Sequence, residues 1–74
     1  MKEFEFRRLN KNDTIKVEGN SLSNAFDRLV EELGFIDNQM SVHGEKVKYV
    51  ASDLNETYVA EETLEEFRSA NQTM

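Results

Sequence analysis

The chain has 74 residues and a formal charge of −6, from 15 acidic and 9 basic side chains. This length accommodates one domain, and a domain of this size buries only about 60% of its unfolded surface, so we expect a single domain over residues 1–74 with a thin core. The acidic surplus disfavours a general nucleic-acid binder, because such a protein needs a basic face that neutralises phosphates.

The residue types needed for several chemistries are missing or scarce. The sequence has no cysteine and one histidine, His43. Disulfides and cysteine catalysis are therefore excluded, and a zinc site would have to combine His43 with carboxylates alone. We expect no cofactor, no metal and no enzymatic activity, with His43 a solvated turn residue. Association with another subunit remains as a way to supplement the core.

The expected location is the cytoplasm. The first eight residues alternate charged and aromatic side chains, without the apolar run of a signal peptide. No stretch approaches the roughly 20 apolar residues that span a bilayer, so we expect no membrane association.

Two N-terminal segments alternate apolar and charged residues, one around Phe6 and one around Ile15 and Val17. The period of two predicts half-buried strands, joined by a polar turn at residues 10–13. Closing this hairpin would place Phe6 opposite Val17 on the apolar face. It would also place Arg7 opposite Lys16 on the polar face, where two like charges favour an acidic partner.

Residues 22–33 carry apolar side chains at helical spacing, with charged residues on the other side. Ser21 is suited to cap the start of this helix, and Gly34 supplies the left-handed residue that ends it. Phe35 is then placed to pack back on Val30. Start and stop signals therefore agree on one helix.

Three further strands are predicted at residues 40–43, 46–52 and 57–61. The first two are separated by Gly44-Glu45, a pair suited to a type II′ hairpin. The expected registers pair Val42 with Val47, Met40 with Tyr49, Ala51 with Tyr58, and Tyr49 with Ala60. Both hairpins then place their apolar residues on one face, while Val50 and Val59 lie on the other.

A short second helix is predicted after Thr63, which forms a capping box with Glu66 and precedes an apolar stripe at Leu64, Phe67 and Ala70. The element order is then ββαβββα. This is an α+β fold, with an antiparallel sheet of about five strands, the longer helix on one face and a short C-terminal helix.

Two binding surfaces follow from this arrangement. The first is acidic and would dock on the basic, nucleic-acid-binding groove of a partner protein, with carboxylates in place of phosphates. Its alternative is a solvated charged surface. The predicted residues are Glu31, Glu32, Asp37, Glu61, Glu62, Glu65 and Glu66, with Asp27 beside them.

The second surface is the outer face of the sheet. Either the C-terminal helix folds over this face, or its apolar residues are available for a symmetric homodimer. The predicted residues are Arg7, Lys16, Lys48, Val50, Val59, Leu64 and Phe67. A further alternative is nucleic-acid binding through Arg7, Arg8, Lys16 and Lys48.

Residues 15–26, IKVEGNSLSNAF, run from a strand through a polar cap into a helix. In this the chain resembles small phage-encoded accessory proteins, among them anti-CRISPR proteins. The resemblance implies an acidic, non-enzymatic inhibitor that occupies the basic groove of a host nucleic-acid-binding protein, in the cytoplasm of the host cell. It carries over no functional residue. The main alternative from the residues is a homodimeric structural or regulatory protein.

Overall fold

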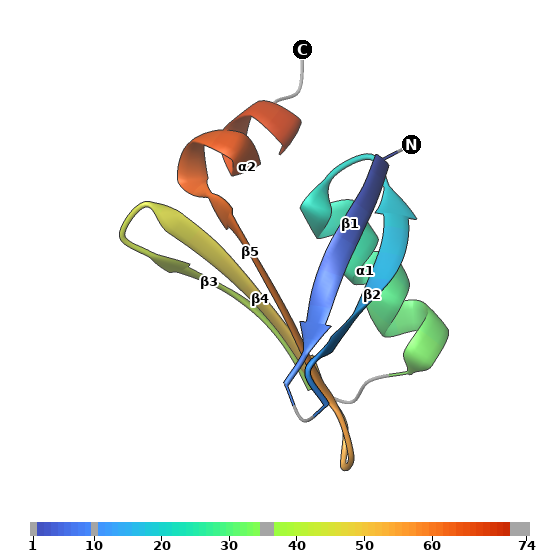
Figure 1. Cartoon of the computed structure of the whole chain (residues 1–74). Helices are drawn as coiled ribbons and strands as arrows, with labels where there is room; N and C mark the ends of the chain where they lie inside the picture. The colour runs from blue at the N-terminus through green and yellow to red at the C-terminus, as the bar shows by residue number, and fades with distance from the viewer. Residues whose placement is uncertain (1, 10, 35–36, 72–74) are drawn as a thin grey trace.

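The computed structural model describes residues 2–9, 11–34 and 37–71 (Figure 1). It confirms the predicted α+β fold and the element order ββαβββα. Within the described residues, no helix is long and apolar enough to cross a membrane. The elements are β1 (Lys2–Arg8), β2 (Asp13–Gly19), α1 (Leu22–Leu33), β3 (Asp37–His43), β4 (Lys46–Ser52), β5 (Thr57–Thr63) and α2 (Leu64–Asn71).

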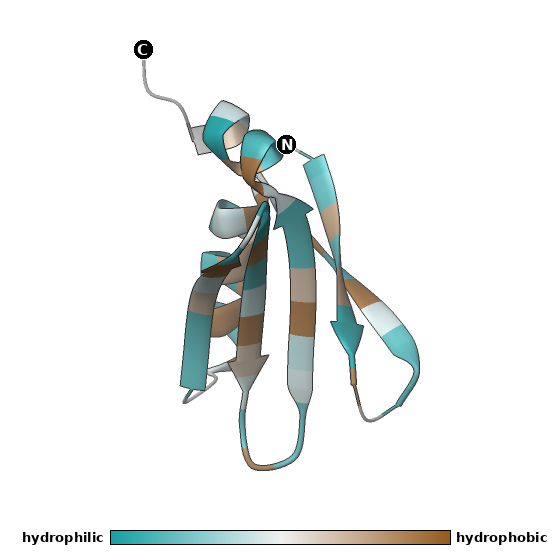
Figure 2. Ribbon diagram, turned by 90° about the vertical axis from the view of Figure 1, so that its left-hand side faces the viewer, coloured by the Kyte–Doolittle hydropathy of each residue, from teal (hydrophilic) through white to brown (hydrophobic). Residues whose placement is uncertain are grey.

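The five strands form one sheet in the order β2-β1-β5-β4-β3, and every neighbouring pair is antiparallel. The sheet therefore joins the β1–β2 hairpin to the three-stranded meander β3–β5 along the β1–β5 boundary. Helix α1 covers one face of the sheet. Figure 2 shows the sheet from the opposite face, with α1 behind it. We call the face that carries α1 the inner face and the opposite one the outer face.

The core lies between α1 and the inner face. Phe26 of α1 links the two parts of the sheet, because its ring lies 6.3 Å from the ring of Phe6 on β1 and 5.2 Å from that of Tyr49 on β4. Aromatic pairs at such distances add to the free energy gained by burial. The buried core residues are Phe6, Leu22, Ala25, Phe26, Leu29, Val47, Tyr49, Ala51 and Tyr58.

Helix α1 begins and ends as its sequence predicts. The Ser21 hydroxyl accepts a hydrogen bond from the Asn24 N–H at 3.1 Å, which caps the first turn. Gly34 is left-handed, with φ of 64°, and its N–H donates to the Val30 carbonyl at 2.9 Å. The predicted contact of Phe35 with Val30 lies outside the described residues.

The registers predicted for the meander are confirmed: Val42 faces Val47, Met40 faces Tyr49 and Ala51 faces Tyr58. Gly44 has φ of 62°, as the first central residue of a type II′ turn requires. Strand β3 is longer than predicted. It begins at Asp37, because its pairing with β4 continues to Ser52.

The register predicted for the first hairpin is wrong by two residues. Phe6 faces Ile15 and not Val17, and Arg7 faces Thr14 and not Lys16. Strand β1 ends at Arg8 and β2 begins at Asp13, so the connection starts one residue earlier than the predicted turn of residues 10–13. Arg8 forms an ion pair with Asp13 at its base.

A shift of two residues keeps each side chain on its face, so the predicted apolar face survives the error. The repulsion expected between Arg7 and Lys16 does not arise. Lys16 instead lies opposite Glu5, a pair of unlike charges.

The suggested packing of the second helix over the outer face is also wrong. Leu64 and Phe67 of α2 pack against the core cluster on the inner face, and not on Val50 and Val59. The Thr63–Glu66 capping box is formed as predicted, with both of its backbone hydrogen bonds at 3.0 Å. Helix α2 follows β5 without a loop and contacts α1.

Candidate protein-binding surfaces

The sheet is split between β1 and β5. These strands pair at Arg7–Val59 and Arg8–Tyr58, and they diverge toward the end of the molecule that carries α2 (Figure 1). Continuing the register would place Glu5 directly opposite Glu61. Like charges at directly opposed positions disfavour pairing at this point, although β1 and β2 stay paired where Glu3 faces Glu18.

The split leaves main-chain groups without strand partners. The Leu9 N–H donates to the Thr57 carbonyl at 3.0 Å, so alternate residues of β5 from Thr57 onward, including Glu61, direct their N–H and C=O toward β1. By the same alternation, the main-chain N–H and C=O groups of Glu5 point toward β5. No pairing between Glu5 and Glu61 occurs in the part of the chain that the structure describes.

Four of the seven predicted acidic residues gather around this split. Glu62, Glu65 and Glu66 line a hollow of about 480 Å³ between the N-terminal half of β1 and α2. Glu61 lines a smaller hollow, of about 280 Å³, on the outer face. Glu5 lines that hollow too, and sequence reasoning missed it, because its place beside Glu61 depends on the order of the strands.

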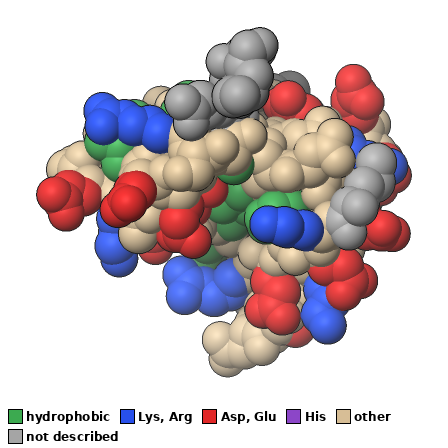
Figure 3. Space-filling model, turned by 90° about the horizontal axis from the view of Figure 1, so that it is seen from above, with side chains coloured by type: hydrophobic (Ala, Val, Ile, Leu, Met, Phe, Trp, Pro, Cys, Tyr) green, Lys and Arg blue, Asp and Glu red, His purple; other side chains and the backbone are tan. Residues whose placement is uncertain are grey.

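Basic side chains lie among these carboxylates, as Figure 3 shows for this end of the molecule. Lys2 lines the larger hollow, and Lys48 faces Glu61 in the register of β4 with β5. The negative charge of the carboxylates at this end is therefore partly offset by lysines. The local charge is determined by the exposed acidic side chains at the rim of the hollows.

The carboxylates at the split divide into two kinds. Glu62 accepts a hydrogen bond from the Tyr49 hydroxyl at 2.7 Å, and Glu66 accepts one from the Thr63 backbone at 3.0 Å. The bonds from the Thr63 backbone and hydroxyl hold the pKa of Glu66 below its usual range. Glu61 and Glu65 are exposed and make no hydrogen bond or ion pair with the described residues. They are available to a partner.

The other predicted acidic residues do not join this surface. Glu31 and Glu32 lie in the last turns of α1, at the end of the molecule away from α2 (Figure 1). Asp37 begins the edge strand β3. The predicted acidic face is therefore two separate regions.

The predicted sheet-face surface is brought together in part. Arg7, Val59 and Val50 are consecutive neighbours across the outer face. Val59 is only 7% exposed and Val50 is half-buried, which leaves little apolar area for a partner. Lys16 and Lys48 share this face, each opposite a glutamate. The face carries mixed charge and is not a basic patch of the kind that binds phosphates.

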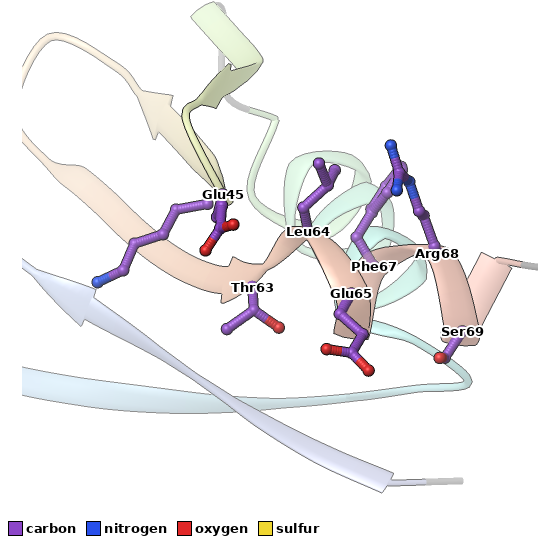
Figure 4. Close-up of a pocket in the computed structure, with 8 residues that line it drawn as sticks. Glu45, Thr63, Leu64, Glu65, Phe67, Arg68 and Ser69 are labelled. Carbon is purple, nitrogen blue, oxygen red and sulfur yellow. The ribbon is translucent and has the colours of Figure 1, made fainter.

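Leu64 and Phe67 belong to a different part of the surface. They are half-buried and line a hollow of about 940 Å³ between α2 and the β3–β4 turn. Figure 4 shows their side chains on one side of α2, with Glu65 on the other side. They therefore cannot contribute to a contact made by Val50 and Val59.

His43 is exposed at the end of β3, as expected for a residue beside a turn. Its Nε2 lies 3.0 Å from the Ser41 hydroxyl on the same strand. Neither residue lines the hollows described above. Within the described residues, no group of three or more His, Asp or Glu side chains is placed to hold a metal ion.

Comparisons with protein-family models, with curated proteins and with solved structures give no match. The function is therefore argued from the surfaces of this chain alone.

Proposed function

We propose that this protein is a non-enzymatic protein-binding module whose acidic end docks on a basic surface of a partner, of the kind that otherwise binds nucleic acid. The acidic end consists of Glu5, Glu61, Glu62, Glu65 and Glu66. The observation that carries the proposal is the split between β1 and β5, where Glu5 and Glu61 lie on opposite sides of an opening in the sheet.

The arrangement suits the recognition of lysine and arginine side chains. Glu61 and Glu65 are exposed at the rim, whereas Glu62 and Glu66 are held in place by hydrogen bonds from Tyr49 and Thr63. Carboxylates on a rigid scaffold attract a basic groove over a distance and resemble the phosphates it normally binds. A partner that brings positive charge to the split also relieves the repulsion between its two sides.

The resemblance to phage-encoded accessory proteins supports the same reading. A small acidic protein that occupies a basic groove would inhibit a host nucleic-acid-binding protein by competition. We therefore propose the cytoplasm of the host cell as its place of action.

The test is capture of partners from nuclease-treated host lysate by the tagged protein, with two variants of equal charge change. One is Glu61→Lys with Glu65→Lys, which reverses two of the carboxylates at the acidic end that make no hydrogen bond within the described residues. The other is Glu31→Lys with Glu32→Lys, at the far end of α1. Both sites are exposed, so the fold should survive and is checked by circular dichroism.

The proposal expects a basic, nucleic-acid-binding protein to be captured by the wild type and by the Glu31/Glu32 variant, and to be lost with the Glu61/Glu65 variant and at high salt. Equal capture by both variants would exclude the acidic end as the docking surface. Equal loss of capture with both variants would mean that the interaction depends on the net charge of the protein and not on a particular surface.

A further inference from the structure

Strand β3 forms an open edge of the sheet, because its neighbour in the strand order is β4 alone. All but one of its seven residues are exposed, and it pairs with β4 continuously, without a bulge. Its sequence, DNQMSVH, contains no lysine, arginine or proline. Natural proteins usually protect edge strands with such features, and β2, the other edge, carries Lys16 and Glu18.

The main-chain groups that β3 presents can be assigned. The Leu64 N–H donates to the Glu45 carbonyl at 2.6 Å, in register with the β4–β5 pairing. Glu45 and every second residue after it along β4 therefore direct their main-chain N–H and C=O groups to β5. Lys46 and every second residue after it direct theirs to β3. The residues of β3 that bond to this second set are His43, Ser41, Gln39 and Asp37. The residues left with outward N–H and C=O groups are Asn38, Met40 and Val42.

Two of these three residues are also exposed and apolar. Met40 is 48% and Val42 is 53% exposed, although both lie on the inner face with the core. The corresponding residues of β4, Tyr49 and Val47, are fully buried, whereas Met40 and Val42 stay about half exposed at the edge. Apolar side chains beside unpaired main-chain groups favour the addition of a further strand.

We propose that this edge pairs with β3 of a second copy of the chain, antiparallel about a two-fold axis, with Met40 of each copy facing Met40 of the other. In this register Asn38 of each copy faces Val42 of the second copy. All outward N–H and C=O groups are then paired, since each of the three facing pairs exchanges two hydrogen bonds. Met40 and Val42 of both copies form one apolar cluster.

The same register places a hydrogen-bond acceptor, a carboxylate, opposite a possible donor, an imidazole, at both ends of the strand. Asp37 faces His43 of the second copy, and the two-fold axis repeats this contact. A strand from another protein could pair with the same main-chain groups. The match between the first and last residues of one strand, however, arises only when two copies meet, and it identifies a second copy as the occupant. A symmetric contact of this kind closes on itself as a dimer.

This inference is independent of the proposed function. The split lies at the β1–β5 boundary, whereas the dimer uses the far edge of the sheet. The dimer would present two acidic ends to its partners. Loss of the dimer contact would leave partner binding in place, and loss of partner binding would leave the dimer.

The first test is the mass of the untagged chain in solution, measured by sedimentation equilibrium over a concentration series into the high micromolar range. We expect a dimer of twice the 8.6 kDa chain mass. Met40→Lys should weaken it by about tenfold or more, because two lysines would face each other in place of an apolar contact. Leu54→Lys is the matched control, since Leu54 is 91% exposed in the loop between β4 and β5 and takes no part in the proposed contact.

The second test fixes the register. Asp37→His and His43→Asp should each weaken the dimer, and the double variant should restore it, because the exchanged residues face each other again. Within one chain these residues lie roughly 20 Å apart along the strand, too far for direct contact. A monomer at every concentration, or equal effects of Met40→Lys and Leu54→Lys, would overturn the dimer. Weakening without restoration would overturn the register and with it the choice of occupant.

Discussion

The hydroxyl of Tyr49 on β4 donates a hydrogen bond to the Glu62 carboxylate on β5, with 2.7 Å between the two oxygens. The Tyr49 side chain is fully buried, so its hydroxyl reaches from the core to the base of the split. This contact connects the stability of the fold to the acidic end. It also means that Glu62 cannot be replaced without disturbing the core, unlike Glu61 and Glu65.

Tyr49→Phe should lower the free energy of unfolding by about 1–2 kcal/mol, because it removes a hydrogen bond to a charged group while keeping the ring in place. Urea denaturation followed by circular dichroism measures the change. Tyr58→Phe is a comparison at a longer contact, 3.3 Å from its hydroxyl to Glu56, and should cost less. Unchanged stability in Tyr49→Phe would show that the contact with Glu62 contributes nothing in solution.

Stability should also fall at alkaline pH. Burial, and then the hydrogen bond and charge of Glu62, raise the pKa of Tyr49 above its ordinary value of 10.0. A raised pKa in the folded state stabilises the protein below the ordinary value, and this contribution is lost as the pH rises above about 10. Burial raises the pKa of Tyr58 as well, so Tyr49→Phe should make the decline shallower without abolishing it. Denaturation curves between pH 8 and pH 11 test this, and an identical decline in wild type and variant would refute it.

Stability should also fall at acidic pH, because of the ion pair between Arg8 and Asp13 at the base of the first hairpin. The hydrogen bond from Arg8 lowers the pKa of Asp13 from its ordinary value of 3.8. A lowered pKa stabilises the folded state above that value, and the contribution is lost as the pH falls below it. Asp13→Asn should therefore reduce stability at neutral pH and flatten the decline on acidification. Parallel acid titrations of the two proteins would show this, and equal slopes would argue against the ion pair.

Much of the fold could be predicted from local signals. Ser21 and the Thr63–Glu66 capping box fixed where the two helices begin, and Gly34 fixed where α1 ends. Gly44 fixed a two-residue turn and with it the register of β3 and β4. The first hairpin lacked such a signal, because the polar run at residues 10–13 contains no glycine that fixes where the turn begins. Its register was therefore wrong by two residues.

The candidate site depended on information that local patterns do not contain. The order β2-β1-β5-β4-β3 places Glu5 beside Glu61 and creates the split, and no periodicity in the sequence specifies that β1 adjoins β5. The side of the sheet on which α2 packs is likewise not specified by a local pattern. Glu61, Glu62, Glu65 and Glu66 were predicted because they are close in sequence, whereas Glu5 was not.

Amide hydrogen exchange tests the split directly. Arg7 and Val59 are paired across the β1–β5 boundary, so their N–H groups should exchange slowly. The N–H groups of Glu5 and Glu61 point into the split without strand partners and should exchange much faster. Equal protection at all four residues would mean that the two strands are paired along their length in solution.

The central claim is that the acidic end occupies a surface that otherwise binds nucleic acid. The most direct measurement is therefore a competition, in which the captured partner and the wild-type protein are titrated with the nucleic acid that the partner binds. We expect the nucleic acid to displace the protein, and Glu61→Lys with Glu65→Lys to remove its ability to compete, whereas Glu31→Lys with Glu32→Lys keeps it. A stable complex of partner, nucleic acid and this protein together would contradict the account.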